Sequence, residues 1–343
     1  MSPPPVVVRR LLTRPIAFVV GLLLALVLLP CWLLSTVLVS LNIAAVARPL
    51  RLFCFAYVYL VVEVVGLIAA LGHWVRAGGA TATDTAQARN HALLGDCLTV
   101  LLTAAEYFFS LDIESHPSES AEPEAPMIVV SRHAGPGDSF LLVHRLIVGL
   151  NRRPHVVLKS TLQWDPLLDV LLTRSANVFV TAGEPTDAVV RRITDLARGL
   201  GVDDALLIFP EGGNFTENRR TQVIERLRAN GHHAAAQRAE DLERLLAPRI
   251  TGLQSALVAR PDAAVCVVAH TGLDEIDTLA EVWDAVPVRN TLLVSWEYFA
   301  ADDVPRDPTG LHDWLGYHWQ LMDTWVAVES ARLAAAAESS DNA

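Results

Sequence analysis

Residues 127–139 read MIVVSRHAGPGDS and join a short apolar run to a polar, glycine-rich turn. The run Met127–Ser131 has the length and composition of a buried strand, and an apolar helical pattern begins after the turn. This order places His133 at the end of the strand and Asp138 near the start of the helix. The Gly-Pro-Gly between the two side chains permits a tight turn that folds the carboxylate back towards the imidazole.

Short apolar runs alternate with longer amphipathic runs from this stretch to near the carboxyl terminus. The alternation predicts an α/β domain built on a mixed, largely parallel sheet flanked by helices. Ahead of the sheet, apolar positions at helical spacing predict a helix over Asp84–Phe109, and the acidic, Pro- and Ser-rich segment Glu114–Pro126 predicts a loop. The strand candidates are Met127–Ser131, His155–Leu158, Asn177–Val180, Ala205–Phe209, Ala264–Ala269 and Thr291–Trp296.

The amino-terminal part of the chain is strongly apolar, in a sequence that is 52% hydrophobic overall. Pro15–Ala47 has no charged residue, and Leu52–Gly72 is interrupted only by Glu63. As one straight helix the first run would span about 50 Å, against about 30 Å of membrane hydrocarbon, and Pro30 should kink or break it. Residues 1–76 are therefore predicted to form a membrane-embedded helical hairpin.

The topology of this hairpin stays open, because arginines precede, separate and follow the two runs and the positive-inside rule favours no side. The hairpin either spans the membrane twice or lies kinked in one leaflet, and both arrangements put the rest of the chain on the same side. The four cysteines lack metal-ligand or disulfide spacing, which indicates a reduced setting. We expect a cell (inner) membrane protein whose catalytic domain, residues 77–332, faces the cytoplasm, followed by a disordered tail, residues 333–343.

The pair His133 and Asp138 suits acid–base chemistry. A carboxylate that accepts a hydrogen bond from one ring nitrogen fixes the tautomer and leaves the other nitrogen free to act as a base. It also stabilises the imidazolium that forms after proton transfer. The alternative is that His133 is an ordinary loop residue and that Asp138 caps the following helix.

A second polar turn favours the chemical interpretation. Pro210, Glu211, Gly212 and Gly213 follow the strand candidate Ala205–Phe209, at the kind of strand end where open α/β sheets bind ligands. The two glycines let a ligand approach backbone N–H groups, and Glu211 is suited to accept hydrogen bonds from ligand hydroxyls. The alternative is a connector with a solvated glutamate.

Together the two turns resemble the glycerolipid acyltransferase family typified by 1-acyl-sn-glycerol-3-phosphate acyltransferase. His133 and Asp138 are similar to its His-x4-Asp motif, and residues 209–212 to its Phe-Pro-Glu-Gly motif, in the same order and strand context. The finer resemblance is to the branch that reacylates lysophospholipids such as lysophosphatidylinositol and lysocardiolipin. It is carried by Leu158–Leu162, Phe215–Asn218, Ala247–Gly252 and a carboxyl-terminal pattern from Val304 to Asp323.

The resemblance implies acyl transfer from acyl-CoA or acyl carrier protein to the hydroxyl of a lysophospholipid, at a phospholipid membrane. His133 would be the general base and Asp138 would orient it, with no cofactor, metal ion or acyl-enzyme. Residues that bind phosphate would come from the basic side chains near the turns. The implied substrate-binding residues are Pro210, Glu211, Gly212, Gly213, Lys159, Arg132 and Arg249. Lys159 is the only lysine, which its role or an arginine-rich composition explains equally well.

One departure from the family pattern leaves the acceptor open. The position at which the family carries an arginine, shortly after the strand candidate Asn177–Val180, is Ala182. Arg174, Arg191, Arg219 and Arg220 are nearby in sequence and are candidates to replace it. The loss motivates an alternative, a non-catalytic membrane protein that binds lipid on the same fold. Hydrolysis is disfavoured because a Gly-x-Ser-x-Gly motif is lacking, and the net charge of −11 argues against nucleic acid as a partner.

Overall fold

The computed structural model describes residues 3–41, 47–116, 120–135, 137–274, 279–288 and 290–341. The chain divides into two compact units, each assembled from segments that are far apart in the sequence. The first unit comprises residues 1–112, 140–184 and 278–289, and the second comprises residues 113–139, 185–277 and 290–343. The first unit thus combines the amino-terminal helices with later segments, and the domain boundary expected at residue 76 stays a prediction.

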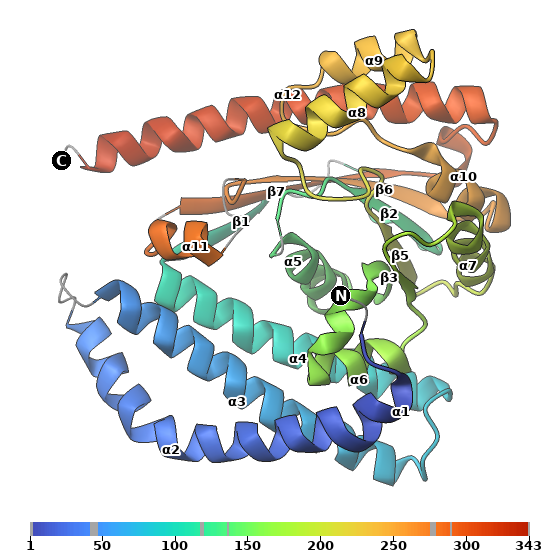
Figure 1. Ribbon diagram of the computed structural model, residues 1–343. Helices are drawn as coiled ribbons and strands as arrows, with labels where there is room; N and C mark the ends of the chain where they lie inside the picture. Colours follow the sequence, from blue (N-terminus) through green and yellow to red (C-terminus); the bar gives the residue numbers. More distant parts are fainter. Residues whose placement is uncertain are drawn as a thin grey trace. The chain divides into compact units, whose positions relative to one another are not determined.

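Long apolar helices dominate the first unit. In Figure 1, α2 (Arg14–Ser40), α3 (Ala47–Arg76) and α4 (Asp84–Phe109) are the blue to blue-green helices, with α2 packed on α3 and α3 on α4. α2 runs through Pro30 without a break and is curved in the figure. The bounds of α4 are those predicted from the apolar spacing, and Thr83 caps this helix by accepting a hydrogen bond from the Ala86 N–H.

Three helices within the described residues have the length and composition to cross a membrane. They are Val6–Ser40, Arg48–Arg76 and Asp84–Phe109. The first two confirm the predicted apolar helical region at the amino terminus. The third was predicted as a helix but was not assigned to the membrane.

The remaining elements of the first unit are short. They are α1 (Val6–Val8), η1 (Arg9–Thr13), η3 (Arg145–Gly149), β3 (Arg153–Lys159), η4 (Ser160–Trp164), α6 (Pro166–Arg174), β4 (Val178–Val180) and α11 (Leu279–Ala285). β3 and β4 pair in parallel, with Val157 opposite Val178. Glu63, the one charged residue in the second apolar run, accepts a hydrogen bond of 2.8 Å from the Leu167 N–H at the start of α6. A helix N-terminus favours this arrangement because its N–H groups lack partners within the helix.

A buried cluster of charges ties the amino terminus to α6. Asp169, whose side chain is 1% exposed, accepts from Arg9 Nη1 at 2.7 Å and from Arg14 Nη2 at 2.5 Å. The two arginines precede the apolar stretch of α2, so this cluster fixes where that helix begins against α6. A buried carboxylate is tolerated only when it is paired, as it is here.

The second unit is built around three parallel strands. β2 (Met127–Ser131) pairs in parallel with β5 (Asp204–Ile208) on one side and with β6 (Ala264–Thr271) on the other, and β6 pairs antiparallel with β7 (Asn290–Phe299). All residues of β2 and β5 are buried. Since parallel neighbours end at the same edge of a sheet, the residues that follow β2, β5 and β6 come together.

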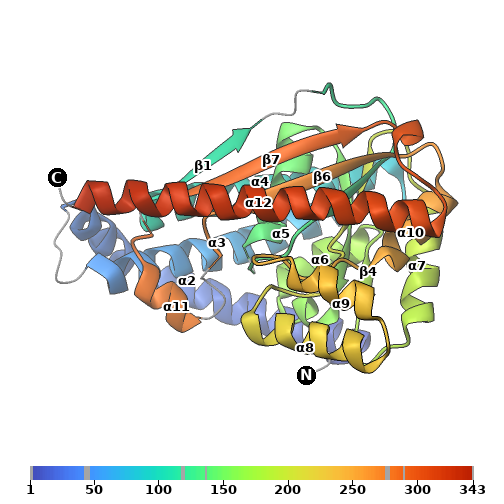
Figure 2. The same cartoon turned by 90° about the horizontal axis from the view of Figure 1, so that it is seen from above.

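Helices cover the strands of the second unit. They are α7 (Thr186–Arg198), α8 (Glu217–Ala229), α9 (His233–Glu240), α10 (Ile250–Ala259), η5 (Ala301–Asp303) and α12 (Pro308–Asp341). α12 packs on β6 and β7, and Figure 2 shows it in red along these strands. Its Trp319 is fully buried and donates a hydrogen bond of 3.0 Å to the Leu246 carbonyl. The helix continues to Asp341, through residues that we expected to fray.

The described residues form seven strands in a mixed, mostly parallel sheet with helices, which confirms the predicted fold class. The six strand candidates correspond to β2 to β7. The sequence analysis missed β1 (Leu111–His116), part of which lies in the predicted loop over Glu114–Pro126. β1 alternates buried or half-buried with exposed residues, and this short alternation was hidden by its acidic side chains. α5 (Asp138–His144) begins in the second unit and ends in the first.

Replacing Asp169 with asparagine should destabilise the folded chain. The substitution leaves Arg9 and Arg14 in place without their carboxylate, and breaking a buried ion pair in this way costs about 3 kcal/mol or more. We expect a clear fall in the midpoint of thermal unfolding of the full chain in detergent. Asp195→Asn is the matched control, because Asp195 pairs with Arg198 at the surface, where both side chains are more than 60% exposed. Equal midpoints for the two variants would contradict the structural role of Asp169.

Candidate active site

The His133 imidazole and the Asp138 carboxylate form a hydrogen-bonded pair. Nδ1 of His133 lies 2.9 Å from Oδ2 and 3.2 Å from Oδ1 of Asp138. β2 delivers His133 at its carboxyl end, and Asp138 opens α5 after the glycine-rich turn. The turn residue Pro136 lies outside the described residues. The pairing expected from the sequence is therefore present in the structure.

Backbone N–H groups complete the environment of Asp138. Oδ2 accepts from the N–H of Ala134 at 2.8 Å and of Gly135 at 3.1 Å, and Oδ1 accepts from the N–H of Ser139 at 2.5 Å. Burial alone would raise the pKa of Asp138, but the hydrogen bond from His133, the charges of His270 and His133 and the Gly135 N–H together lower it. Asp138 is thus an anion at neutral pH that accepts from Nδ1–H of His133.

The second ring nitrogen of His133 is available. Among the residues that the structure describes, Nε2 has no hydrogen-bond partner, and the side chain is 15% exposed. The Phe209 ring lies against the imidazole, with ring centroids 4.7 Å apart. With its proton on Nδ1, the ring presents an unprotonated Nε2 that can accept a proton from a ligand.

Glu211 binds backbone rather than solvent. Its Oε2 accepts from the His133 N–H at 2.9 Å and its Oε1 from the Leu246 N–H at 3.1 Å, and the residue is 3% exposed. Burial raises the pKa of Glu211 to about 8, against the lowering effects of Arg132 and the two N–H groups. Both carboxylate oxygens are therefore used inside the protein, and the predicted contact with ligand hydroxyls stays a prediction.

The turn after β5 is held by its neighbours. The Pro210 carbonyl accepts from the Arg249 N–H at 3.0 Å, and Gly212 has a φ of 72°, in the left-handed region that favours glycine. A Cβ atom at Gly212 would come within 3.4 Å of the Arg249 guanidinium. That distance is ordinary van der Waals contact, so the φ angle is what favours glycine at position 212. At Gly213 a Cβ atom would come within 2.9 Å of the Arg219 guanidinium, the end of a flexible side chain that can move aside.

A buried network of polar side chains lies next to the His133–Asp138 pair. Arg132 is 1% exposed; it forms an ion pair with Asp274 and donates to the His270 carbonyl at 2.9 Å. His270 Nε2 lies 3.2 Å from the Arg132 carbonyl oxygen and 3.7 Å from Oδ2 of Asp138. Burial lowers the pKa of His270, and the Asp138 and Asp274 carboxylates oppose this. Sequence reasoning missed Asp274, although it follows a strand end as Asp138 and Glu211 do.

The other predicted binding residues are dispersed. Arg132 is engaged in the buried network, which favours a structural role, and its contact with phosphate stays a prediction. Arg249 is exposed beside Gly212. Lys159 is exposed at the end of β3 in the first unit. No group of three or more His, Cys, Asp or Glu side chains placed to hold a metal ion is found in the part of the chain that the structure describes.

Most arginines named as substitutes for an arginine at Ala182 already bind main-chain carbonyls. Arg174 donates to the Ala70 carbonyl at 2.8 Å, and Arg219 donates to the Asn214 carbonyl. Arg220 donates to the carbonyls of Leu242 at 2.6 Å and Glu240 at 2.8 Å. These contacts favour structural roles for the three side chains, so the question that the loss at position 182 raises about the acceptor remains.

The pH dependence of stability should report on Glu211. Its folded pKa of about 8 exceeds the ordinary value of 4.5, so between these limits the folded chain binds more protons than the unfolded chain. The free energy of unfolding from this group then falls as pH rises through that window, by up to about 1.4 kcal/mol per pH unit. Glu211→Gln carries no titrating group and should remove this fall, as measured by thermal unfolding in detergent from pH 5 to 8. Glu217→Gln, at a side chain 73% exposed, should keep the wild-type profile. Parallel profiles for wild type and Glu211→Gln would contradict the assignment.

Two comparisons with known proteins find similarities to this chain. Residues 112–251 match the model of the Acyltransferase family, and this segment contains both turns. The fold is similar to the crystal structure of the 1-acyl-sn-glycerophosphate (LPA) acyltransferase PlsC from Thermotoga maritima. The TM-score is 0.55 at 13% identity, over 82% of this chain and 98% of that chain. No curated protein matches the chain significantly. Residues 112–251 therefore resemble an acyltransferase domain, and the chain has a fold similar to that of this acyltransferase.

Proposed function

We propose that this protein transfers an acyl group from a thioester donor to the hydroxyl of a lysophospholipid, with His133 as general base. The observation that carries the proposal is the contact of 2.9 Å between Nδ1 of His133 and Oδ2 of Asp138, from which we infer the tautomer of His133. Asp138 accepts from Nδ1–H, and Nε2 is left without a partner among the described residues at the edge where three parallel strands end. This is the arrangement that a base needs before substrate arrives.

The proposed reaction is a direct transfer. Nε2 of His133 takes the proton of the acceptor hydroxyl while its oxygen attacks the thioester carbonyl carbon. The resulting tetrahedral intermediate expels the thiolate, breaking the C–S bond, and the thiolate takes the proton back from Nε2. Asp138 holds the ring and stabilises the imidazolium between these steps. No acyl group is attached to the enzyme, and the donor is a co-substrate, not a bound cofactor.

The acceptor class rests on family likeness and on the apolar helices. The similar solved structure is that of a 1-acyl-sn-glycerophosphate (LPA) acyltransferase, and the finer sequence resemblance is to the lysophospholipid-reacylating branch. A lysophospholipid partitions into a bilayer, so helices long enough to cross a membrane bring the enzyme to its acceptor at high local concentration. Lys159 is the candidate for contact with the acceptor phosphate.

Replacing His133 with alanine should abolish acyl transfer. A positioned general base contributes about 10²- to 10⁴-fold to a rate, so we expect His133→Ala and Asp138→Asn each to lower turnover by at least about 10²-fold. The measurement is transfer from acyl-CoA, and separately from acyl carrier protein, to a panel of lysophospholipids by the full chain in detergent. His233→Ala, at an exposed histidine on α9, is the control and should retain wild-type turnover.

Two other outcomes of this assay would favour rival functions. If wild type turns over no faster than His133→Ala on any acceptor, the proposal fails. If both variants also bind lipid as wild type does, the protein is a non-catalytic lipid-binding member of the fold, the alternative that the loss of arginine at Ala182 motivates. Release of free fatty acid without acceptor would instead identify a hydrolase.

We further propose that the protein lies in the cell (inner) membrane with its catalytic residues facing the cytoplasm, where acyl thioesters are made. A green fluorescent protein fused after the last residue should then fluoresce in cells. Alkaline phosphatase fused at the same point should be inactive, because it folds only after export to an oxidising compartment. An active phosphatase fusion combined with a dark fluorescent fusion would contradict this orientation.

A further inference from the structure

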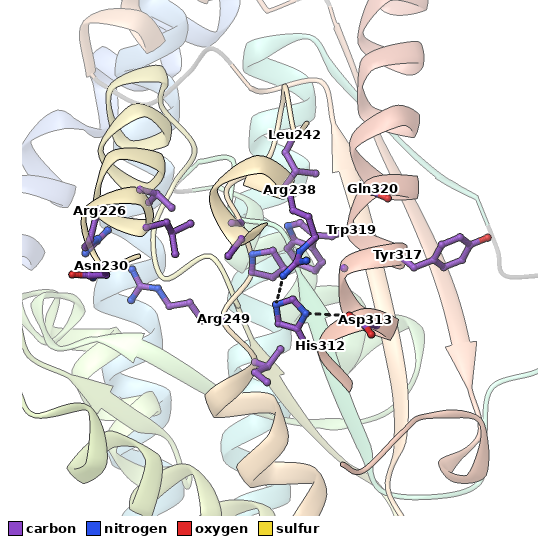
Figure 3. Close-up of a pocket in the computed structure, with 17 residues that line it drawn as sticks. Arg226, Asn230, Arg238, Leu242, Arg249, His312, Asp313, Tyr317, Trp319 and Gln320 are labelled. Carbon is purple, nitrogen blue, oxygen red and sulfur yellow. Dashed lines mark hydrogen bonds and ion pairs between the residues drawn. The ribbon is translucent and has the colours of Figure 1, made fainter. Parts of the chain in front are cut away.

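A cavity of about 470 Å³ lies in the second unit, among α8, α9, α12 and residues 247–250. Figure 3 shows the side chains that line it. The volume is in the range of small-molecule binding sites. Leu242, Pro248 and Trp319 give the cavity an apolar lining, and Trp319 is held by its hydrogen bond to the Leu246 carbonyl.

Three arginines line this cavity without an acidic partner. They are Arg226 on α8, Arg238 on α9 and Arg249 beside the turn after β5, and none forms an ion pair with a carboxylate in the described ranges. The other arginines of α8 are engaged: Arg219 and Arg220 bind main-chain carbonyls, and Arg228 pairs with Glu240 at 2.6 Å. In a chain with a net charge of −11, this concentration of unpaired positive charge favours an anionic ligand.

The positive charge is arranged in two groups. Arg249 and Arg226 are close enough that, after burial, the charge of Arg226 is the second cause that lowers the pKa of Arg249. Arg238 lies with its guanidinium 3.5 Å from Nε2 of His312, and Nδ1 of His312 lies 3.5 Å from Oδ1 of Asp313. Figure 3 shows these groups in different parts of the cavity. Two basic groups in one partly apolar cavity suit a ligand with two separate phosphate-bearing positions and a flat organic body.

Arg249 connects the cavity to the catalytic turn. Its N–H donates to the Pro210 carbonyl, and its guanidinium lies against Gly212. The intervening residue, Glu211, accepts the N–H of His133. A ligand held by Arg249 is therefore one turn of backbone away from the residue that positions the catalytic imidazole, which is where one end of a long co-substrate would be expected.

We propose that this cavity binds the nucleotide of a coenzyme A thioester, with Arg226 and Arg249 on one phosphate position and Arg238 with His312 on the other. Coenzyme A carries a 3′-phosphate and a 5′-diphosphate on one adenosine. The two phosphate-bearing positions match the two basic groups, and the adenine ring matches the apolar lining of the cavity. A carrier protein presents one phosphodiester and an acidic protein surface, which a flat basic face would recognise better than a cavity. The inference rests on the proposed function and names its donor.

The first test is binding without turnover. Adenosine 3′,5′-bisphosphate is titrated calorimetrically into the full-length His133→Ala protein in detergent, so that catalysis plays no part. Each charge-assisted hydrogen bond to phosphate contributes about 1.5 kcal/mol or more, so Arg226→Gln and Arg238→Gln, each added to this protein, should weaken binding about tenfold or more. Arg228→Gln is the matched control on α8, since Arg228 pairs with Glu240 and does not line the cavity.

The second test is kinetic. Arg226→Gln should raise KM for acyl-CoA about tenfold and leave KM for acyl-pantetheine, which lacks the nucleotide, unchanged. A structural defect would instead alter both donors and kcat together. Thermal unfolding of Arg226→Gln should match that of wild type, because this side chain makes no ion pair within the described residues.

Several results would overturn the inference. It fails if the bisphosphate does not bind, or if Arg226→Gln and Arg228→Gln bind it equally well. It also fails if the arginine variants lose only binding to vesicles that contain an anionic phospholipid, or raise only KM for acyl carrier protein. A protein that transfers acyl groups but binds no bisphosphate refutes this inference alone. A protein that binds bisphosphate through these arginines but transfers nothing supports the nucleotide site and refutes the proposed function alone.

Discussion

The buried Asp138 carboxylate is the constraint on which the candidate site depends. An anion in the protein interior costs several kcal/mol unless its oxygens are satisfied. Here they are satisfied by the His133 ring and by three backbone N–H groups from Ala134, Gly135 and Ser139. The turn takes the conformation that directs those N–H groups at the Asp138 carboxylate. The same carboxylate accepts a hydrogen bond from the His133 ring and so orients it. The orientation of the His133 ring thus follows from the hydrogen bonds that stabilise the buried Asp138 carboxylate.

The polar network beside the His133–Asp138 pair also consists of buried groups that satisfy one another's charges and hydrogen bonds. Arg132, Asp274 and His270 are linked by an ion pair and by main-chain hydrogen bonds, and His270 lies within 3.7 Å of Asp138. Arg132 thereby bridges the carboxyl ends of β2 and β6, which parallel pairing has already brought together. A guanidinium suits this place because its planar donors reach a carboxylate and a carbonyl at once, which an ammonium group does less well.

The sequence predicts those parts of the molecule that have a local pattern. The helix Asp84–Phe109 and the strand Met127–Ser131 have the predicted bounds, because apolar spacing and a cap or a turn mark both. The His133–Asp138 contact was predictable because both partners lie on one short turn. β1 was missed because acidic side chains mask its alternation. The roles of Arg132 and Glu211 were not predictable, since their partners at residues 246, 270 and 274 are distant in sequence. The basic cavity is lined by residues between 223 and 250 and between 312 and 320, so no local sequence pattern predicts it.

The two hydrogen bonds of Glu211 have a consequence for how the chain between the two turns can vary. Its carboxyl group accepts the His133 N–H on one side and the Leu246 N–H on the other, and the parallel pairing of β2 with β5 holds the two turns side by side. The 78 residues that separate His133 from Glu211 along the chain do not set this arrangement. Loops that connect the strands and helices of that interval can therefore differ in length while the two turns keep their relative position. Glu211 thus links the two turns directly, and this link is what allows the connecting loops to vary in length.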